Sequence, residues 1–154
     1  MLKVITDSWD HPWEGFKSSF VGCNQSEVEW VAPCYENEQT EIEWPLAGSI
    51  LWHLNHVGAC KSAYAWDLNH PDEKDNLSTW SVELNLDKLR LRLDEVHDEF
   101  CKASKIFDPR RVIMGKGGHA LEEYIGIVIR HEIWHGGQIA LIRRMYKILS
   151  LTSR

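Results

Sequence analysis

The last fifth of the chain carries an apolar pattern of helical period that runs for about thirty residues without a proline. Side chains on one face recur every three or four residues from Leu121 to Leu149, and the pair Gly136-Gly137 interrupts the run of good helix formers. An α-helix rises about 1.5 Å per residue, so this segment predicts a helix about 45 Å long. A helix of this length with one apolar face must bury that face against other helices.

Three further helices are expected upstream. Residues 86–107 repeat the spacing of three and four, with Asn85 or Asp87 as a cap and Asp108-Pro109 as a stop. Residues 49–68 lie between turn-forming segments, and a shorter helix is expected from Pro12 to Gly22. Segments 23–48 and 69–84 are expected to be loops. No segment alternates with period two and no change of composition marks a second domain, so we predict that residues 1–154 form one all-α four-helix bundle.

Composition and charge exclude several classes of protein. The 154 residues are 44% apolar and 26% charged, which is ordinary for a globular domain. The net charge of −6 disfavours a nucleic-acid partner, which would require a basic surface. The chain shows neither a signal peptide nor an apolar run long enough to span a membrane. Its four cysteines are scattered, without a CxxC pair, so we expect a reduced, cytoplasmic protein.

The long C-terminal pattern contains the sequence HEIWH, in which His131 and His135 are four residues apart on the apolar face. Both imidazoles can therefore reach one metal ion. HExxH also occurs in zinc proteases, but those commonly take a third ligand from downstream, and no His, Asp or Glu follows His135. A third ligand must therefore come from upstream. The alternative is that both histidines are buried structural residues with ordinary hydrogen-bond partners.

The upstream donors lie in SILWHLNHVGAC, residues 49–60. His53 and His56 are three residues apart, and Cys60 follows one turn later. Counting 100° per residue, the apolar face of this helix lies nearer His53 than His56. Periodicity therefore favours His53 as the third ligand, while His56 stays open. Cys60 can approach the metal or can be a small core residue. His97 and Cys101 also have ligand-like spacing, but we expect them to be a surface pair.

The two histidine segments together resemble the DinB-like superfamily of metal-binding four-helix bundles. The family's first signature is similar to S-I-x-x-x-L-x-H and is matched here by Ser49, Ile50, Leu54 and His56. Its last-helix signature is similar to H-E-I-x-H-x-G-Q-I and is matched by residues 131–139. The resemblance implies an up-down-down-up bundle, a homodimer, and His56, His131 and His135 as ligands of a divalent metal. Position 136, often basic in the family, is glycine here.

Three imidazoles leave an open position on the metal, where a thiol or water can be activated. Characterised proteins that resemble this family use a low-molecular-weight thiol. The resemblance therefore implies a thiol-dependent transferase or isomerase that acts on a small electrophilic molecule. Hydrolysis of an amide or ester is the alternative, with Glu132 as general base and Gln138 orienting water. A non-catalytic metal-binding or small-molecule-binding protein stays open as well. Zn, Ni, Fe and Mn all suit three imidazoles.

Overall fold

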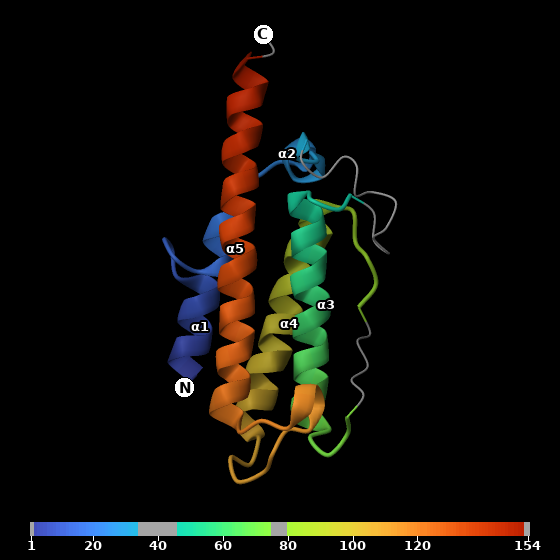
Figure 1. Ribbon diagram of the computed structural model, residues 1–154, viewed down its shortest axis with the longest axis vertical. Helices are drawn as coiled ribbons and strands as arrows, with labels where there is room; N and C mark the ends of the chain where they lie inside the picture. Colours follow the sequence, from blue (N-terminus) through green and yellow to red (C-terminus); the bar gives the residue numbers. More distant parts are fainter. Residues whose placement is uncertain (1, 34–45, 75–79, 153–154) are drawn as a thin grey trace.

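The computed structural model describes residues 2–33, 46–74 and 80–152, and within these residues it is helical, with no β-strand. Four α-helices pack side by side: α1 (Leu2–Asp10), α3 (Ile50–Asn69), α4 (Leu86–Ile106) and α5 (Leu121–Thr152) (Figure 1). Helices α3 and α1 each contact both α4 and α5. The short helix α2 (Gln25–Glu29) and the 3₁₀ helices η1 (Phe16–Ser19) and η3 (Gly115–Gly117) lie in the connections.

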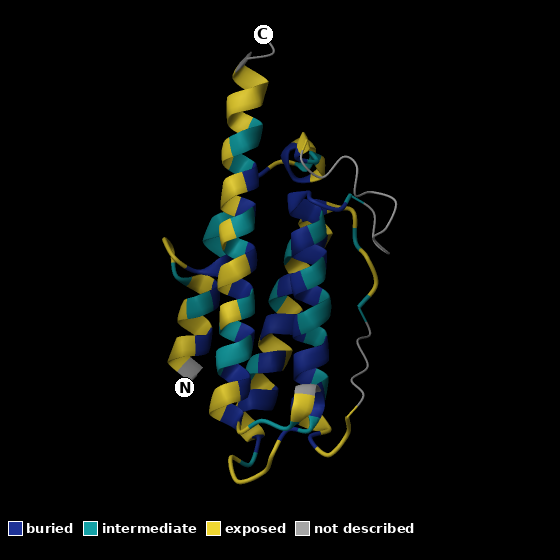
Figure 2. Cartoon of the chain, viewed as in Figure 1, coloured by how far each residue is buried: buried dark blue, intermediate teal, exposed yellow. Residues whose placement is uncertain are grey.

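The three longer helices confirm the periodicity of the sequence. The Ser49 side chain caps α3 by accepting a hydrogen bond from the Trp52 amide at 3.1 Å. Asn85 caps α4 in the same way at the Lys88 amide, at 3.0 Å. Each cap satisfies one of the amides that a helix leaves without an intrahelical partner. Helix α5 extends past the other helices, and its free end is exposed (Figure 2).

The N-terminal prediction was wrong. The helix precedes Pro12 instead of starting there, and only η1 lies between Pro12 and Gly22. The reason is that Ile5 and Trp9, one turn apart and each 1% exposed, give α1 its buried face. Pro12 then follows this helix, where it cannot continue the hydrogen bonding. The 23–48 loop prediction missed α2, which Asn24 caps. The parts of the predicted loops at 34–45 and 75–79 lie outside the described residues.

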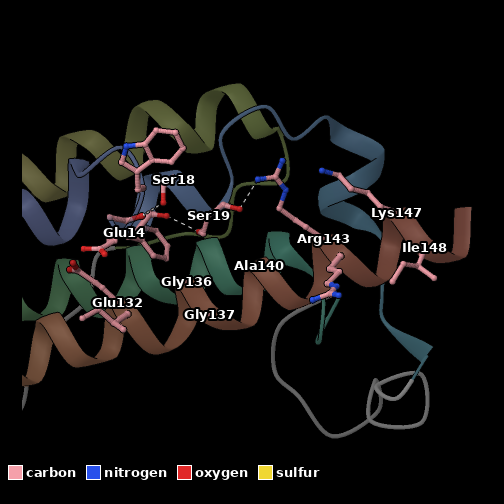
Figure 3. Close-up of a pocket in the computed structure, with 15 residues that line it drawn as sticks. Glu14, Ser18, Ser19, Glu132, Gly136, Gly137, Ala140, Arg143, Lys147 and Ile148 are labelled. Carbon is pink, nitrogen blue, oxygen red and sulfur yellow. Dashed lines mark hydrogen bonds between the residues drawn. The ribbon is translucent and has the colours of Figure 1, made fainter. Parts of the chain in front are cut away.

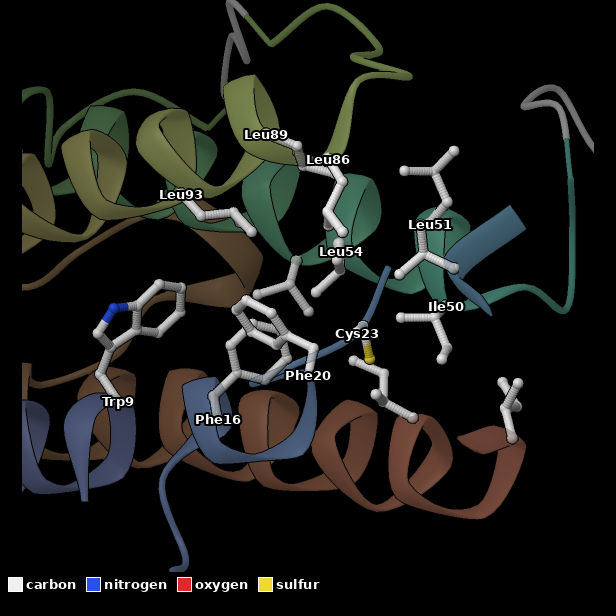
Figure 4. Packing of buried hydrophobic residues seen from close by; sticks show 14 residues of the cluster. Trp9, Phe16, Phe20, Cys23, Ile50, Leu51, Leu54, Leu86, Leu89 and Leu93 are labelled. Atoms are coloured by element: carbon white, nitrogen blue, oxygen red, sulfur yellow. The ribbon is translucent and has the colours of Figure 1, made fainter. Parts of the chain in front are cut away.

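The apolar core forms two clusters along the bundle. One gathers around Trp9, Phe16, Phe20 and Leu54 (Figure 4), and the other around Tyr64, Phe100 and Tyr124. Between them, each of the three long helices contributes polar side chains at buried or half-buried positions. We call these side chains the middle layer; they are His56, Cys60, Lys61, His97, Cys101, His131, Glu132 and His135. Buried polar groups require partners, so the middle layer is where function is to be sought.

No helix within the described ranges combines the length and the apolar content that crossing a bilayer requires.

Two helix glycines provide a matched test of the packing. A methyl group on Gly58 would lie 2.4 Å from the Trp80 ring, whereas one on Gly137 would meet nothing within 4 Å. We expect Gly58→Ala to destabilise the fold by about 1–3 kcal/mol through overpacking. Gly137→Ala is expected to stabilise it by up to about 1 kcal/mol through helix propensity. Urea denaturation measures both, and equal effects of the two substitutions would contradict the packing of Trp80 against α3.

Candidate metal centre

Three histidine side chains meet between α3 and α5. The Nε2 atom of His131 lies 3.1 Å from Nε2 of His56 and 3.1 Å from Nε2 of His135. Helix α5 provides two of these rings because its residues 131 and 135 are one turn apart. Helix α3 provides the third ring, and the centroids of the His56 and His135 rings are 4.7 Å apart. The structure thus brings together all three residues of the expected ligand set.

These separations fit a tetrahedral metal ion. Bond lengths of about 2.0–2.1 Å from zinc to nitrogen place two tetrahedral nitrogen ligands about 3.3 Å apart. The observed 3.1 Å between Nε2 atoms differs from that value by a few tenths of an ångström. Two neutral imidazoles held edge to edge at such a distance satisfy at most one hydrogen bond between them, whereas a metal ion satisfies every nitrogen that points at it.

His53 contacts His135 on the side of the ring that faces away from this meeting point. Their Nδ1 atoms lie 2.8 Å apart, and the His53 side chain is buried. If His135 binds metal through Nε2, its proton is on Nδ1 and is donated to His53, which fixes the orientation of the ring. His53 Nε2 is buried with no hydrogen-bond partner among the described residues. His53, the residue that periodicity favoured, therefore lies at the Nδ1 side of His135, away from the contact between His135 and His131.

Cys60 adjoins the His56 side of the candidate centre. Its Sγ is 3.6 Å from Nε2 of His56, and one ligand atom from each of His56, Cys60 and His131 lies within 4.8 Å of the other two. All three side chains are half-buried. The group is therefore reachable from solvent and combines two imidazoles with a thiol, which are the usual ligand types of zinc.

Aromatic rings enclose the histidines. Trp52 stacks on His56 with ring centroids 5.1 Å apart and an interplanar angle of 8°. Trp134 meets His135 edge to face at 4.6 Å, and Tyr64 meets His131 edge to face at 6.0 Å. Such rings exclude water and restrict the imidazoles to a few orientations.

Burial keeps two of the rings neutral. Burial, followed by the charges of His131, His53 and His56, lowers the pKa of His135 to about 2. Burial and the charge of His56 lower the pKa of His53 to about 4. Neutral imidazole is the form that binds a metal ion. At neutral pH the buried side of the centre therefore needs no deprotonation before it can bind metal.

Glu132, the expected general base, lies in a buried ion pair. Its Oε1 is 2.5 Å from Nζ of Lys61, and both side chains are at most 3% exposed. Its Oε2 accepts a hydrogen bond of 3.4 Å from the Ser8 hydroxyl. Burial raises the pKa of Glu132 and lowers that of Lys61, while the charge of each partner opposes the shift of the other. The structure thus ties this carboxylate to α3 and α1.

The pair His97 and Cys101 is buried or half-buried, which corrects the expectation of a surface pair. Nζ of Lys61 lies 2.7 Å from Nδ1 of His97, and the His97 ring stacks on Trp9 at 4.6 Å. An ammonium group only donates, so Nδ1 accepts and the ring proton is on Nε2, which lies 3.3 Å from Sγ of Cys101. Sequence reasoning missed this network. Its signal was Lys61, a charged residue at a core position of α3.

The network predicts a pH dependence of stability. Burial, then the charges of Lys61 and Lys17, lowers the pKa of His97 to about 3. The unfolded chain, where histidine titrates near 6.5, binds the proton first as the pH falls, so stability is lost progressively from about pH 6.5 towards about pH 3. We expect His97→Gln, which retains an acceptor for Lys61, to remove up to about 1.4 kcal/mol per pH unit from this slope. Denaturation of metal-free protein at several pH values measures it, and an unchanged slope would contradict a buried neutral His97.

Gln138 is half-buried on α5, and its side chain makes no hydrogen bond within the described parts of the chain. The structure therefore places it one turn beyond His135 without bringing it into contact with the other expected site residues.

A groove of about 820 Å³ lies on the other side of α5, against η1 (Figure 3). It is lined by Ser18, Ser19, Glu132 and Gly136 among others, and by none of the four histidines. Arg143 crosses it to donate to the Ser19 carbonyl oxygen at 2.9 Å. A methyl group on Gly136 would be 3.8 Å from Phe16, so no close approach of the backbone explains this glycine.

Fold and site together define a helical bundle with a candidate histidine–cysteine metal group at its middle layer. Comparison with protein-family models, curated proteins and solved structures returned no match to this chain. The functional argument therefore rests on the geometry of the side chains.

Proposed function

We propose that the protein is a divalent-metal enzyme whose ion is held by His56, His131 and His135, and that it transfers or isomerises through a low-molecular-weight thiol. The observation that carries the proposal is that Nε2 of His131 lies 3.1 Å from Nε2 of both His56 and His135, close to the spacing of about 3.3 Å between two nitrogen ligands of a tetrahedral ion. A bound ion of this kind would lower the pKa of a coordinated thiol or water. The substrate is a small electrophilic molecule.

Other residues of the chain would position the ligand side chains. His53 holds the His135 ring through the Nδ1 contact, and Trp52 covers the face of the His56 ring. Both contacts fix the ligand side chains before a metal or substrate arrives, which reduces the cost of binding. Glu132 is a positioning residue in this proposal: through Lys61 it fixes the rotation of α5 relative to α3 and thereby keeps His131 opposite His56.

The hydrolytic alternative is less well supported. It needs a carboxylate within about 2.6–3.2 Å of the reacting water, or connected through one water. Glu132 instead directs one oxygen to Lys61 and the other to Ser8. Thiol-dependent chemistry needs no such base, because a metal ion alone lowers the pKa of a thiol.

An activity screen tests the proposal. Metal-loaded protein is incubated with a panel of small electrophiles, with bacillithiol, mycothiol or glutathione and without a thiol. We expect loss of the electrophile that requires both thiol and metal and that is abolished in His135→Ala. Turnover without a thiol would favour the hydrolase, and no acceleration by any of the three thiols would refute thiol transfer.

The DinB-like assignment is also a proposal, and the course of the chain supports it. In Figure 1, α1 and α5 run upward, and α3 and α4 run downward, which corresponds to an up-down-down-up order. The two histidine segments lie on α3 and α5, on the helices that correspond to the family's two signatures.

We propose a homodimer formed through α5. The exposed face of this helix carries large apolar side chains at heptad-like spacing, between 53% and 73% exposed: Ile133, Trp134, Leu141, Ile148 and Leu151. A second copy of the same stripe is self-complementary about a two-fold axis. The free end of α5 beyond the other helices leaves room for such pairing (Figure 2).

Leu141→Glu is expected to convert this dimer to a monomer, because it places a charge within an apolar interface. Light scattering coupled to size-exclusion chromatography measures the mass. Leu91→Glu is the matched control, since Leu91 is 66% exposed on α4, outside the stripe. A wild-type monomer, or a dimer that survives Leu141→Glu, would contradict the proposed interface.

A further inference from the structure

Cys60 lies beside His56 at the proposed metal centre. Two helices supply the proposed ligands, α5 with His131 and His135 and α3 with His56. Cys60 follows His56 by one turn of α3, so its side chain lies beside the same face. Sγ of Cys60 and one ring nitrogen each of His56 and His131 form one cluster in which each atom is within 4.8 Å of the others.

The distance from Cys60 to His56 fits two ligands of one ion. Tetrahedral zinc with bonds of about 2.05 Å to nitrogen and 2.3 Å to sulfur places these two atoms about 3.6 Å apart. The observed distance from Sγ of Cys60 to Nε2 of His56 is 3.6 Å. Sγ of Cys60 is therefore at ligand distance from His56, within the group that also contains His131.

A second cysteine shows that the spacing alone is not sufficient. Cys101 follows His97 by four residues, as Cys60 follows His56, and its Sγ is 3.3 Å from Nε2 of His97. That imidazole, however, receives Lys61 at its other nitrogen, and the ammonium group brings a positive charge where a cation would be repelled. Cys60 instead lies in one group with two imidazoles, those of His56 and His131.

We infer that Cys60 is the fourth ligand of the metal, giving a site of three imidazoles and one thiolate. This inference rests on the proposed metal centre and goes beyond it, because it makes the resting site closed and favours a borderline-soft ion such as Zn²⁺ over Mn²⁺. A thiol from solution then binds only by replacing Cys60. In that exchange the incoming thiol loses its proton and the departing Cys60 thiolate gains one, so the charge of the site is unchanged.

Cobalt spectroscopy tests the inference on the full-length chain. Co²⁺ is added to metal-free wild type, to Cys60→Ser and to the matched control Cys101→Ser. We expect the visible bands of tetrahedral cobalt in all three proteins, and a near-ultraviolet thiolate-to-cobalt charge-transfer band in wild type and Cys101→Ser alone. Adding 2-mercaptoethanol to Cys60→Ser is expected to restore the charge-transfer band, since an external thiol then occupies the vacated position.

The outcomes are distinguishable. Bound cobalt without a charge-transfer band in wild type, or a band that survives Cys60→Ser, overturns Cys60 as a ligand and leaves the three-histidine centre intact. Failure of wild type to bind cobalt at all overturns the proposed function itself. X-ray absorption of the zinc-loaded wild type needs no substitution, and it is expected to show one sulfur at about 2.3 Å beside the nitrogen ligands. A shell of nitrogen and oxygen only would refute the inference.

Discussion

Replacing Glu132 by leucine is expected to lower the free energy of unfolding by about 3–5 kcal/mol, because the substitution leaves a buried charge without its partner. Lys61 is 1% exposed, and its nearest oxygen is Oε1 of Glu132, at 2.5 Å. Its other neighbours are Nδ1 of His97 and the face of the Trp9 ring, which is 3.6 Å from Nζ. Neither provides a negative charge. Lys61→Met is expected to destabilise the fold by a similar amount, for the converse reason.

A double substitution separates the pair from its surroundings. When Lys61→Met and Glu132→Leu are combined, we expect a loss smaller than the sum of the two single losses, by about 0.5–3 kcal/mol. Arg111→Ala, which removes an exposed partner of Asp72, is the control and is expected to leave the denaturation midpoint nearly unchanged. Urea denaturation of the four variants measures the coupling. Strict additivity would contradict a direct Lys61–Glu132 interaction. If Glu132→Leu has wild-type stability, the carboxylate is not needed to hold the fold, and Glu132 is again a candidate for the general base.

Removing a ligand is expected to affect metal affinity far more than removing its support. His56→Ala, His131→Ala and His135→Ala each delete a nitrogen at the centre, and we expect each to abolish stoichiometric binding. His53→Ala deletes only the partner of His135 Nδ1, and a loss of about 10–100-fold in affinity is expected.

Competition with a chelating dye measures these dissociation constants for zinc. His11→Ala is the control, because the His11 ring accepts the amide of Glu14 near the N-terminus and lies outside the centre. A His53→Ala variant that loses metal as completely as His56→Ala would make His53 a ligand, as the helical periodicity predicted. A His56→Ala variant that retains metal would remove the basis of the family resemblance.

Periodicity predicted α3, α4 and α5 because each has enough turns for a pattern of three and four to be recognised. It failed for α1, where nine residues offer a single pair, Ile5 and Trp9, and where Pro12 is compatible both with the start of a helix and with its end. The prediction failed because α1 is too short for its pattern to be recognised.

The choice between His53 and His56 could not be made from the sequence, because α3 is buried on several sides. Its buried positions include Ile50, Leu51, His53 and Leu54 in near succession, so no single direction on the helix points to the core. With such a helix, the side chains that meet α5 are decided by its contacts with α4 and α5. The structure gives the two histidines different contacts. His56 meets Nε2 of His131, whereas His53 meets Nδ1 of His135.

The hydrolytic alternative gave Glu132 the role of general base, which needs access to the reacting water. The structure shows a buried set of Val128, Glu132, His135, Ile139 and Ile142, so the carboxylate is at a core position. A charged residue in such a pattern indicates a buried counter-charge, and α3 offers one in Lys61. Lys61 and Glu132 are 71 residues apart in the chain. Their pairing depends on how α3 and α5 face each other in the fold. Neither helix carries that information alone.

The central claim is that this bundle binds a metal ion through histidines of α3 and α5, and its most direct test is the metal content of untagged wild-type protein by elemental mass spectrometry. We predict about one divalent ion per chain, either as purified or after reloading with zinc, nickel, iron or manganese. The absence of stoichiometric metal after all four reloadings would contradict the account. His56, His131 and His135 would then be structural residues of the middle layer, and the proposed enzyme would have no centre.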